Sequence, residues 1–215
     1  MNDQLANVLT FAVLGVMGVR LVTGLRHSRT FEGRSLVVEV LHRIRLRHVW
    51  PVPLLLAAVI ALATALMMVP GLDWGWWTEL GGAGNPVFGS SDATTGTVWE
   101  WVIPLVFMCL LLPALPLFAH AEERIFRSGA EGWSPARRAL KIVQFGLIHA
   151  VIGIPVGAAL ALSLGGAYFM WVYLRAFHLS NSRSDATLES TAAHTAYNGL
   201  IVGLVVVAIL VDAVV

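Results

Sequence analysis

The longest charge-free run of the chain, residues 142–174, limits what the chain can fold into. It contains 33 consecutive residues without Asp, Glu, Lys or Arg. As a single helix it would measure about 50 Å, whereas the hydrocarbon core of a membrane is roughly 30 Å thick. We therefore expect the run to fold back within itself. The Gly-Ile-Pro-Val-Gly segment of residues 153–157 is the expected break.

The composition indicates a membrane protein with several crossings. Of 215 residues, 57% are hydrophobic and 13% are charged, which is too apolar for a soluble domain, and the chain is too long for a single anchor. We predict an all-α fold, a polytopic transmembrane helical bundle with about six crossings. The expected crossings are residues 5–25, 51–69, 98–119 continuing to Glu122, the two halves of the 142–174 run, and 190–211. The first lacks a cleavage site and is expected to be retained. Membrane lipids are expected partners, and the net charge of +1 does not indicate nucleic-acid binding.

The positions of the charged residues indicate the orientation of the bundle. The loop of residues 70–98 contains acidic residues but no Lys or Arg, so the positive-inside rule places it outside. Its tryptophans, with Trp99 and Trp101, are typical of an interfacial aromatic belt, and a ligand-binding role is the alternative. The arginine-rich residues 26–48 predict an amphipathic segment on an anionic leaflet, and residues 178–189 a short cytoplasmic loop. We expect an integral protein of a prokaryotic inner membrane with both ends outside.

Two adjacent carboxylates end the third apolar run. If the helix continues, Glu123 and Arg127 lie four residues apart with the acid first, the favoured orientation for a helical ion pair. Glu122 is then left without a local partner. An unpaired acid at the edge of the membrane is a functional hypothesis by default. The simpler alternative is a charged helix end among the lipid headgroups.

Two histidines are expected at a similar depth in other helices. His149 lies roughly 12 Å along its helix from the cytoplasmic side, and His194 roughly 10 Å. His194 and Asn198 are four residues apart and share a helix face, as do Phe145 and His149. Intramembrane histidines that only make packing hydrogen bonds are the alternative. The similar depths favour one shared site that includes Glu122.

In chain order these residues form three motifs: Glu-Glu-x-x-x-Arg at 122–127, Phe-x-x-x-His at 145–149 and His-x-x-x-Asn at 194–198. The pattern resembles the CAAX protease and bacteriocin-processing family of intramembrane proteases, also called CPBP or Abi proteins. The resemblance covers about residues 98–213. It implies a four-helix catalytic core.

We therefore divide the chain into two parts. Residues 1–97 would hold two N-terminal transmembrane helices, the basic cytoplasmic segment and the tryptophan-rich outer loop. Residues 98–215 would form the CPBP-like core.

The resemblance implies an intramembrane endopeptidase whose active site faces the cytoplasm. Glu122 and His149 would position and deprotonate a water molecule, and His194 and Asn198 would donate to the oxyanion. The substrate would be a peptide or a membrane-anchored protein.

The same resemblance implies structural support for this site. Glu123 and Arg127 would form a structural ion pair, and Phe145 is a further supporting residue.

No cofactor is expected, and zinc is kept as an alternative. Glu122, His149 and His194 could hold a zinc ion with one open position, but no His-Glu-x-x-His spacing supports this. Cys109 is the single cysteine, which excludes a multi-cysteine metal site.

Two functions of other classes stay open. The first is a non-catalytic membrane scaffold or accessory subunit, in which the polar cluster only holds helices together. The second is a small transporter or proton relay, which would need polar groups continuing to the outer face. A substrate-sized cavity that reaches Glu122 and His149 would favour the protease.

Overall fold

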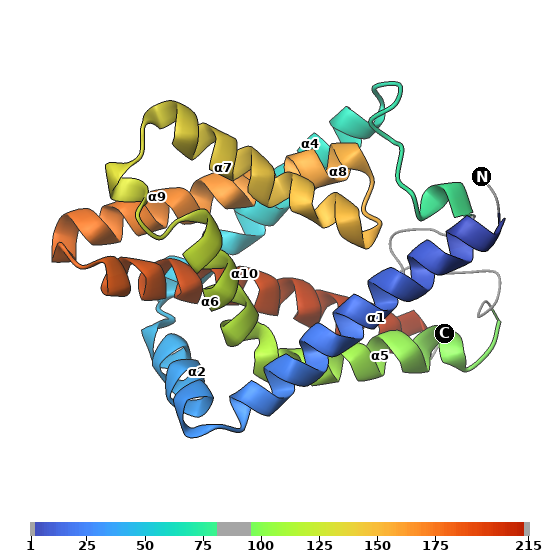
Figure 1. Cartoon of the computed structure of the whole chain (residues 1–215), viewed down its shortest axis with the longest axis horizontal. Coiled ribbons are helices and arrows are strands. Elements are labelled where there is room, and N and C mark those ends of the chain that lie inside the picture. The colour runs from blue at the N-terminus through green and yellow to red at the C-terminus, as the bar shows by residue number, and fades with distance from the viewer. Residues whose placement is uncertain (1–2, 81–95, 213–215) are drawn as a thin grey trace.

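The computed structural model describes residues 3–80 and 96–212, and every regular element in these ranges is helical. The central part of the predicted outer loop, residues 81–95, lies outside the described residues. The all-α prediction is confirmed for the described part (Figure 1). In chain order the helices are α1 Asp3–Ser28, α2 Phe31–Arg43, α3 Leu46–Val49, α4 Val52–Met67, α5 Trp99–Leu111, α6 Leu115–Phe126, α7 Pro135–Leu147, α8 Val156–Ala161, α9 Ser163–Ser180 and α10 Arg183–Asp212. Four short 3₁₀ turns join them: η1 Thr78–Leu80, η2 Leu112–Ala114, η3 Ala130–Gly132 and η4 Ile148–Ile152.

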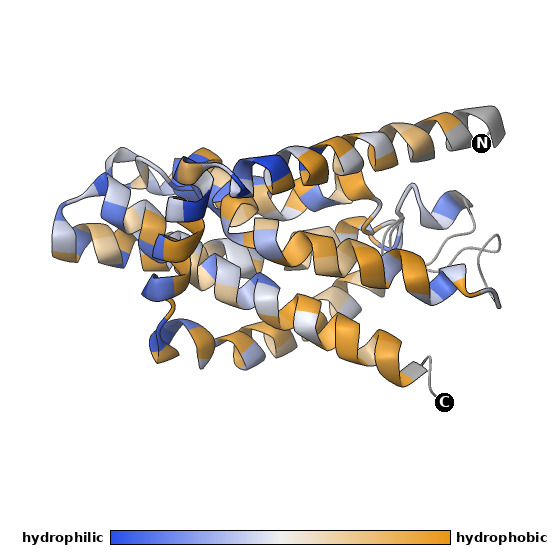
Figure 2. Cartoon of the chain, turned by 90° about the horizontal axis from the view of Figure 1, so that it is seen from below, coloured by the Kyte–Doolittle hydropathy of each residue, from blue (hydrophilic) through white to orange (hydrophobic). Residues whose placement is uncertain are grey.

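Among the described residues, four helical segments are long and apolar enough to cross a membrane. They are Leu46–Met67, Trp99–Gly132, Val156–Ser180 and Arg183–Val211. This number and these lengths are those of an integral membrane protein. Figure 2 shows the hydrophobic ribbon toward the end that carries both termini, while the hydrophilic ribbon gathers toward the opposite end.

The charge-free run folds back where glycine and proline interrupt it. Gly153 has φ +92°, a left-handed conformation that ends η4, and Pro155 precedes the first residue of α8. The loop after α4 fixes this turn, because Trp76 Nε1 donates to the Val151 carbonyl at 3.1 Å. The backbone N–H of Gly157 also donates to a carbonyl of that loop at 2.6 Å. The loop and the turn therefore lie at the same end of the bundle.

Prolines divide the third apolar run, which the sequence predicts as one crossing. α5 ends at Leu111, and α6 begins at Leu115 after the η2 turn. Pro113 and Pro116 lack the N–H groups that a continuous helix would need, so the axis bends there. Figure 1 shows α6 leaving the direction of α5 and crossing α10. This bend brings the acidic end of α6 against the middle of the bundle.

The prediction of a loop over residues 178–189 is wrong, and the cytoplasmic position of this segment stays a prediction. α9 continues to Ser180, Asn181 adopts φ +52° and ends it, and α10 already begins at Arg183. The charged residues of this segment are paired with other parts of the chain. Arg183 contacts Glu131 at 2.6 Å, Asp185 contacts Arg43 at 2.8 Å and Glu189 contacts Arg47 at 2.6 Å.

The basic segment forms α2 and α3, which pack on the bundle. α2 contacts α1, α6 and α10, and α3 contacts α10. Val40 on α2 is fully buried. One side of α2 therefore belongs to the protein core, and contact of its other side with a lipid leaflet stays a prediction.

A cluster of buried side chains joins α4, α6, α7, α9 and α10. It contains Val52, Phe126, Phe145, Phe169, Val172, Ala193 and Tyr197. Long-range packing of α10 against α9 and α6, and of α7 against α9, holds this core together. The polar groups of the candidate site lie directly beside it.

Candidate functional site

The buried centre of the site is an ion pair at the C-terminal end of α6. Arg127 Nη1 donates to Glu123 Oε1 at 2.7 Å, and the two side chains are 1% and 0% exposed. The spacing of four residues along one helix predicts this pair, and the structure has it. Two charges so deeply buried need further partners to offset their desolvation.

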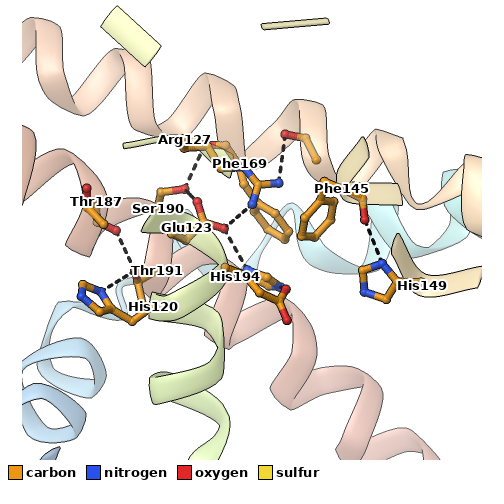
Figure 3. A network of polar contacts seen from close by, with 12 residues as sticks. His120, Glu123, Arg127, Phe145, His149, Phe169, Thr187, Ser190, Thr191 and His194 are labelled. Atoms are coloured by element: carbon orange, nitrogen blue, oxygen red, sulfur yellow. Dashed lines mark hydrogen bonds and ion pairs between the residues drawn. The ribbon is translucent and has the colours of Figure 1, made fainter. Parts of the chain in front are cut away.

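α10 supplies those partners. His194 Nδ1 lies 2.9 Å from Glu123 Oε1, and Ser190 Oγ is hydrogen bonded to Glu123 Oε2 (Figure 3). Ser190 Oγ also lies 3.0 Å from the carbonyl of Phe169. Both oxygens of the Glu123 carboxylate are therefore satisfied. Because an ionised carboxylate only accepts, we assign a proton to Nδ1 of His194.

His194 presents its second nitrogen to the other acid. Glu122 Oε2 lies 3.8 Å from His194 Nε2, which is longer than a hydrogen bond. One water molecule can contact two polar atoms at this separation. The side chain of Glu122 is 28% exposed, whereas Glu123 is fully buried. His194 thus lies between a buried carboxylate and an open one.

Aromatic rings enclose the buried groups. Phe169 stacks on His194 with ring centroids 4.4 Å apart and an interplanar angle of 21°. The guanidinium carbon of Arg127 lies 4.0 Å from the centroid of Phe145, within the range of a cation–π contact. The Phe145 ring also makes edge contacts with His194 at 5.5 Å and His149 at 5.3 Å. These rings exclude water from the ion pair and fix the plane of the His194 imidazole.

The structure places His149 beside this cluster. His149 is half-buried in η4, and its Nδ1 lies 2.8 Å from the carbonyl of Phe145. A carbonyl accepts, so this nitrogen carries a proton and Nε2 is left free. Figure 3 shows His149 apart from His194 and next to Phe145. Among the described residues, no hydrogen bond or ion pair joins His149 to Glu122 or His194.

Asn198 lies one turn after His194 on α10 and is half-buried. Its amide makes no hydrogen bond to another described residue. The structure thus brings Glu122, Glu123, Arg127 and His194 into one network, with Phe145 packed on it. His149 and Asn198 border this network without joining it.

Sequence reasoning missed Ser190 and Phe169. Ser190 precedes His194 by four residues, so helical spacing alone indicates that the two share a face. No local pattern predicts Phe169, because its contact with His194 depends on how α9 packs against α10. A separate polar contact, His120 Nδ1 to Thr191 Oγ1 at 3.3 Å, also joins α6 to α10.

The zinc alternative has no ligand set in the described residues. No group of three or more His, Cys, Asp or Glu side chains there is arranged to hold a metal ion, and this includes Glu122, His149 and His194. We therefore derive no chemical step through a metal. That the protein works without a cofactor stays a prediction.

Two cavities lie elsewhere in the structure. One of about 530 Å³ lies between α2, α3, α9 and the start of α10, and one of about 660 Å³ lies along residues 71–79. Neither is lined by Glu122 or His149. Glu122 instead reaches the surface of the described bundle directly.

Comparisons of the chain with protein-family models, with curated proteins and with solved structures found no match. The resemblance to the CPBP family therefore rests on the three motifs.

Proposed function

We propose that the chain is an intramembrane endopeptidase that hydrolyses a peptide bond near the cytoplasmic face of a prokaryotic inner membrane. The observation that carries the proposal is the open carboxylate of Glu122 opposite His194, whose other nitrogen is held by Glu123. A carboxylate with access to water, next to an imidazole of fixed orientation, is suited to activate a water molecule. The substrate is a peptide or a membrane-anchored protein.

The proposed step uses a water held between Glu122 and His194. Glu122 takes a proton from this water while the water oxygen attacks the substrate carbonyl carbon. Glu122 later gives the proton to the leaving nitrogen as the C–N bond breaks. Asn198 donates its amide N–H to the oxyanion, a contribution worth about 100-fold to 1000-fold in rate. The part of His149 in holding the water rests on the resemblance, because its Nε2 is free to do so but contacts neither residue here.

The proposed topology has six crossings. α1 and the α7–η4 segment are added to the four spans identified by length and composition. The turn at Gly153 contacts the loop after α4, as expected if both lie outside. The end of α6, the start of α7 and the α9–α10 turn then face the cytoplasm. Both chain ends lie outside in this arrangement.

A scaffold or accessory subunit is the second candidate, and two observations favour it. The network of Glu123, Arg127, Ser190 and His194 is satisfied internally and joins α6 to α10 without any need for catalysis. Neither described cavity reaches Glu122. A transporter or proton relay has less support, since no polar chain from this site to the outer end is present in the described residues.

Mass spectrometry of peptide termini separates the two candidates. Membranes from cells producing the wild type, Glu122→Gln or Glu32→Gln are compared, with equal amounts of the three proteins verified by immunoblot. Glu32 is an exposed acid on α2 and serves as the charge-matched control. We expect new termini with the wild type and Glu32→Gln that disappear with Glu122→Gln. Identical termini in all three would exclude cleavage by Glu122 and favour the scaffold.

A further inference from the structure

The cavity of about 530 Å³ lies at the basic end of the bundle, away from Glu122. Its volume falls within the range of small-molecule sites. Trp50 and Trp171 line it, and they are 60% and 53% exposed. Exposed tryptophans next to a membrane span lie at the level of the lipid headgroups. The cavity therefore combines an aromatic rim with a basic interior at the depth where headgroups are found.

The arginines of the cavity are not equivalent. Arg43 contacts Asp185 at 2.8 Å and Arg47 contacts Glu189 at 2.6 Å, so each is neutralised by an acid that also lines the cavity. Among the described residues, no carboxylate lies within ion-pair distance of Arg175. The cavity thus contains one uncompensated positive charge.

The buried His48 also lines the cavity. Its Nδ1 accepts the backbone N–H of Arg45 at 3.2 Å, and its Nε2 lies 2.8 Å from Glu189 Oε1 and 3.4 Å from Arg47 Nε. The imidazole is thus enclosed by groups of the chain itself, and Arg175 remains the lining cation without an acid. A ligand that balances this cation carries a single negative charge.

Arg175 is positioned to meet such a ligand. Its guanidinium carbon lies 5.4 Å from the Trp171 ring, and the side chain is exposed. A guanidinium matches the geometry of phosphate oxygens and forms paired hydrogen bonds with them. The aromatic rim would contact the glycerol and upper acyl groups, which a free phosphate lacks.

We propose that this cavity binds the headgroup of an anionic phospholipid with one phosphodiester charge. Arg175 holds the phosphate, and Trp50 and Trp171 border the glycerol backbone. The site is independent of the proposed catalysis, since none of its residues belongs to the Glu122 network. The sequence predicts a general attraction between the basic face and an anionic leaflet. The proposed site would bind one lipid headgroup at a defined position on that face.

The test compares two exposed arginines that each lie over a tryptophan. Arg137 lies 4.7 Å from the Trp133 ring and is outside the cavity, so Arg137→Gln is the matched control for Arg175→Gln. The full chain in neutral detergent is titrated with phosphatidylglycerol, and bound lipid is measured by native mass spectrometry. We expect Arg175→Gln to weaken binding about tenfold and Arg137→Gln to leave it unchanged.

A second arm distinguishes a lipid from a free phosphate. The soluble headgroup glycerophosphoglycerol is added in excess to the wild type with bound lipid. We expect it not to displace the lipid, because it lacks the acyl groups at the aromatic rim. Equal losses in both arginine variants would show diffuse attraction and overturn the proposal. Displacement by the soluble headgroup at the lipid's own affinity would also overturn it.

Discussion

Glu122 and Glu123 are neighbours in sequence with different surroundings. One residue along a helix turns the side chain by about 100°, so Glu123 faces α10 and the core while Glu122 faces the surface. Glu123 is closed off by Arg127, Ser190 and His194. Glu122 keeps free oxygen lone pairs. The buried acid therefore orients the imidazole, and the open acid is the one that we propose as the base.

Arg127→Ala is expected to destabilise the protein. The change leaves Glu123 charged and fully buried, and breaking a buried ion pair costs about 3 to 5 kcal/mol. Thermal unfolding in detergent should show a clearly lower midpoint than the wild type. Arg137→Ala, which removes an exposed arginine, should leave the midpoint unchanged. Wild-type stability of Arg127→Ala would contradict a structural role for the pair.

His149→Ala tests the role that the resemblance implies. If His149 and Glu122 act on the same water, each single change should reduce cleavage by a similar factor, and the double change should add little. Cleavage rates of the two single variants and the double variant give the answer. A double variant much slower than either single one would place His149 in a separate step.

At the scale of elements, the sequence predicts the break within residues 142–174 but not the contacts between distant helices. Gly153 and Pro155 mark the fold-back because their backbone preferences act locally. Ser134 caps the start of α7, with its Oγ accepting the N–H of Arg137 at 3.3 Å. The start of α10 could not be predicted in this way. Asp185 and Glu189 are balanced by arginines about 140 residues away, and no local pattern shows such a pairing.

Gly146 on α7 packs closely against α8 and α9, so a larger side chain at this position should destabilise the protein. A Cβ there would lie 2.5 Å from the Ala159 carbonyl oxygen, so Gly146→Ala must push these helices apart. We expect a loss of about 1 to 3 kcal/mol in the free energy of unfolding. Gly199 is also helical but has open space around it, so Gly199→Ala should be neutral or slightly stabilising. Chemical unfolding of both variants tests the difference, and equal effects would contradict the close packing.

Across the whole molecule, charge and hydropathy give the two ends different characters. Figure 2 shows the hydrophilic ribbon away from the two termini. The salt bridges of Arg43, Arg47 and Arg183 lie at that end, and the tryptophan-containing loop after α4 lies at the other. This separation is what the positive-inside rule requires of a polytopic protein.

Thiol labelling tests the orientation. In a Cys109→Ala background, Glu79→Cys and Ser134→Cys introduce single exposed cysteines at opposite ends. An impermeant reagent added to intact cells should label Glu79→Cys at once and Ser134→Cys only after permeabilisation. The reverse pattern would invert the orientation and place Glu122 toward the outer face.

The catalytic role of Glu122 is tested most directly by measuring cleavage and thermal unfolding on the same preparation of Glu122→Gln protein. The change keeps the shape of the side chain and removes its ability to take a proton. We predict a wild-type unfolding midpoint with cleavage reduced at least about 100-fold, the usual contribution of a general base. Glu123→Gln should instead lower the unfolding midpoint, because it weakens the pair with Arg127. Cleavage by Glu122→Gln at the wild-type rate would contradict the proposed mechanism.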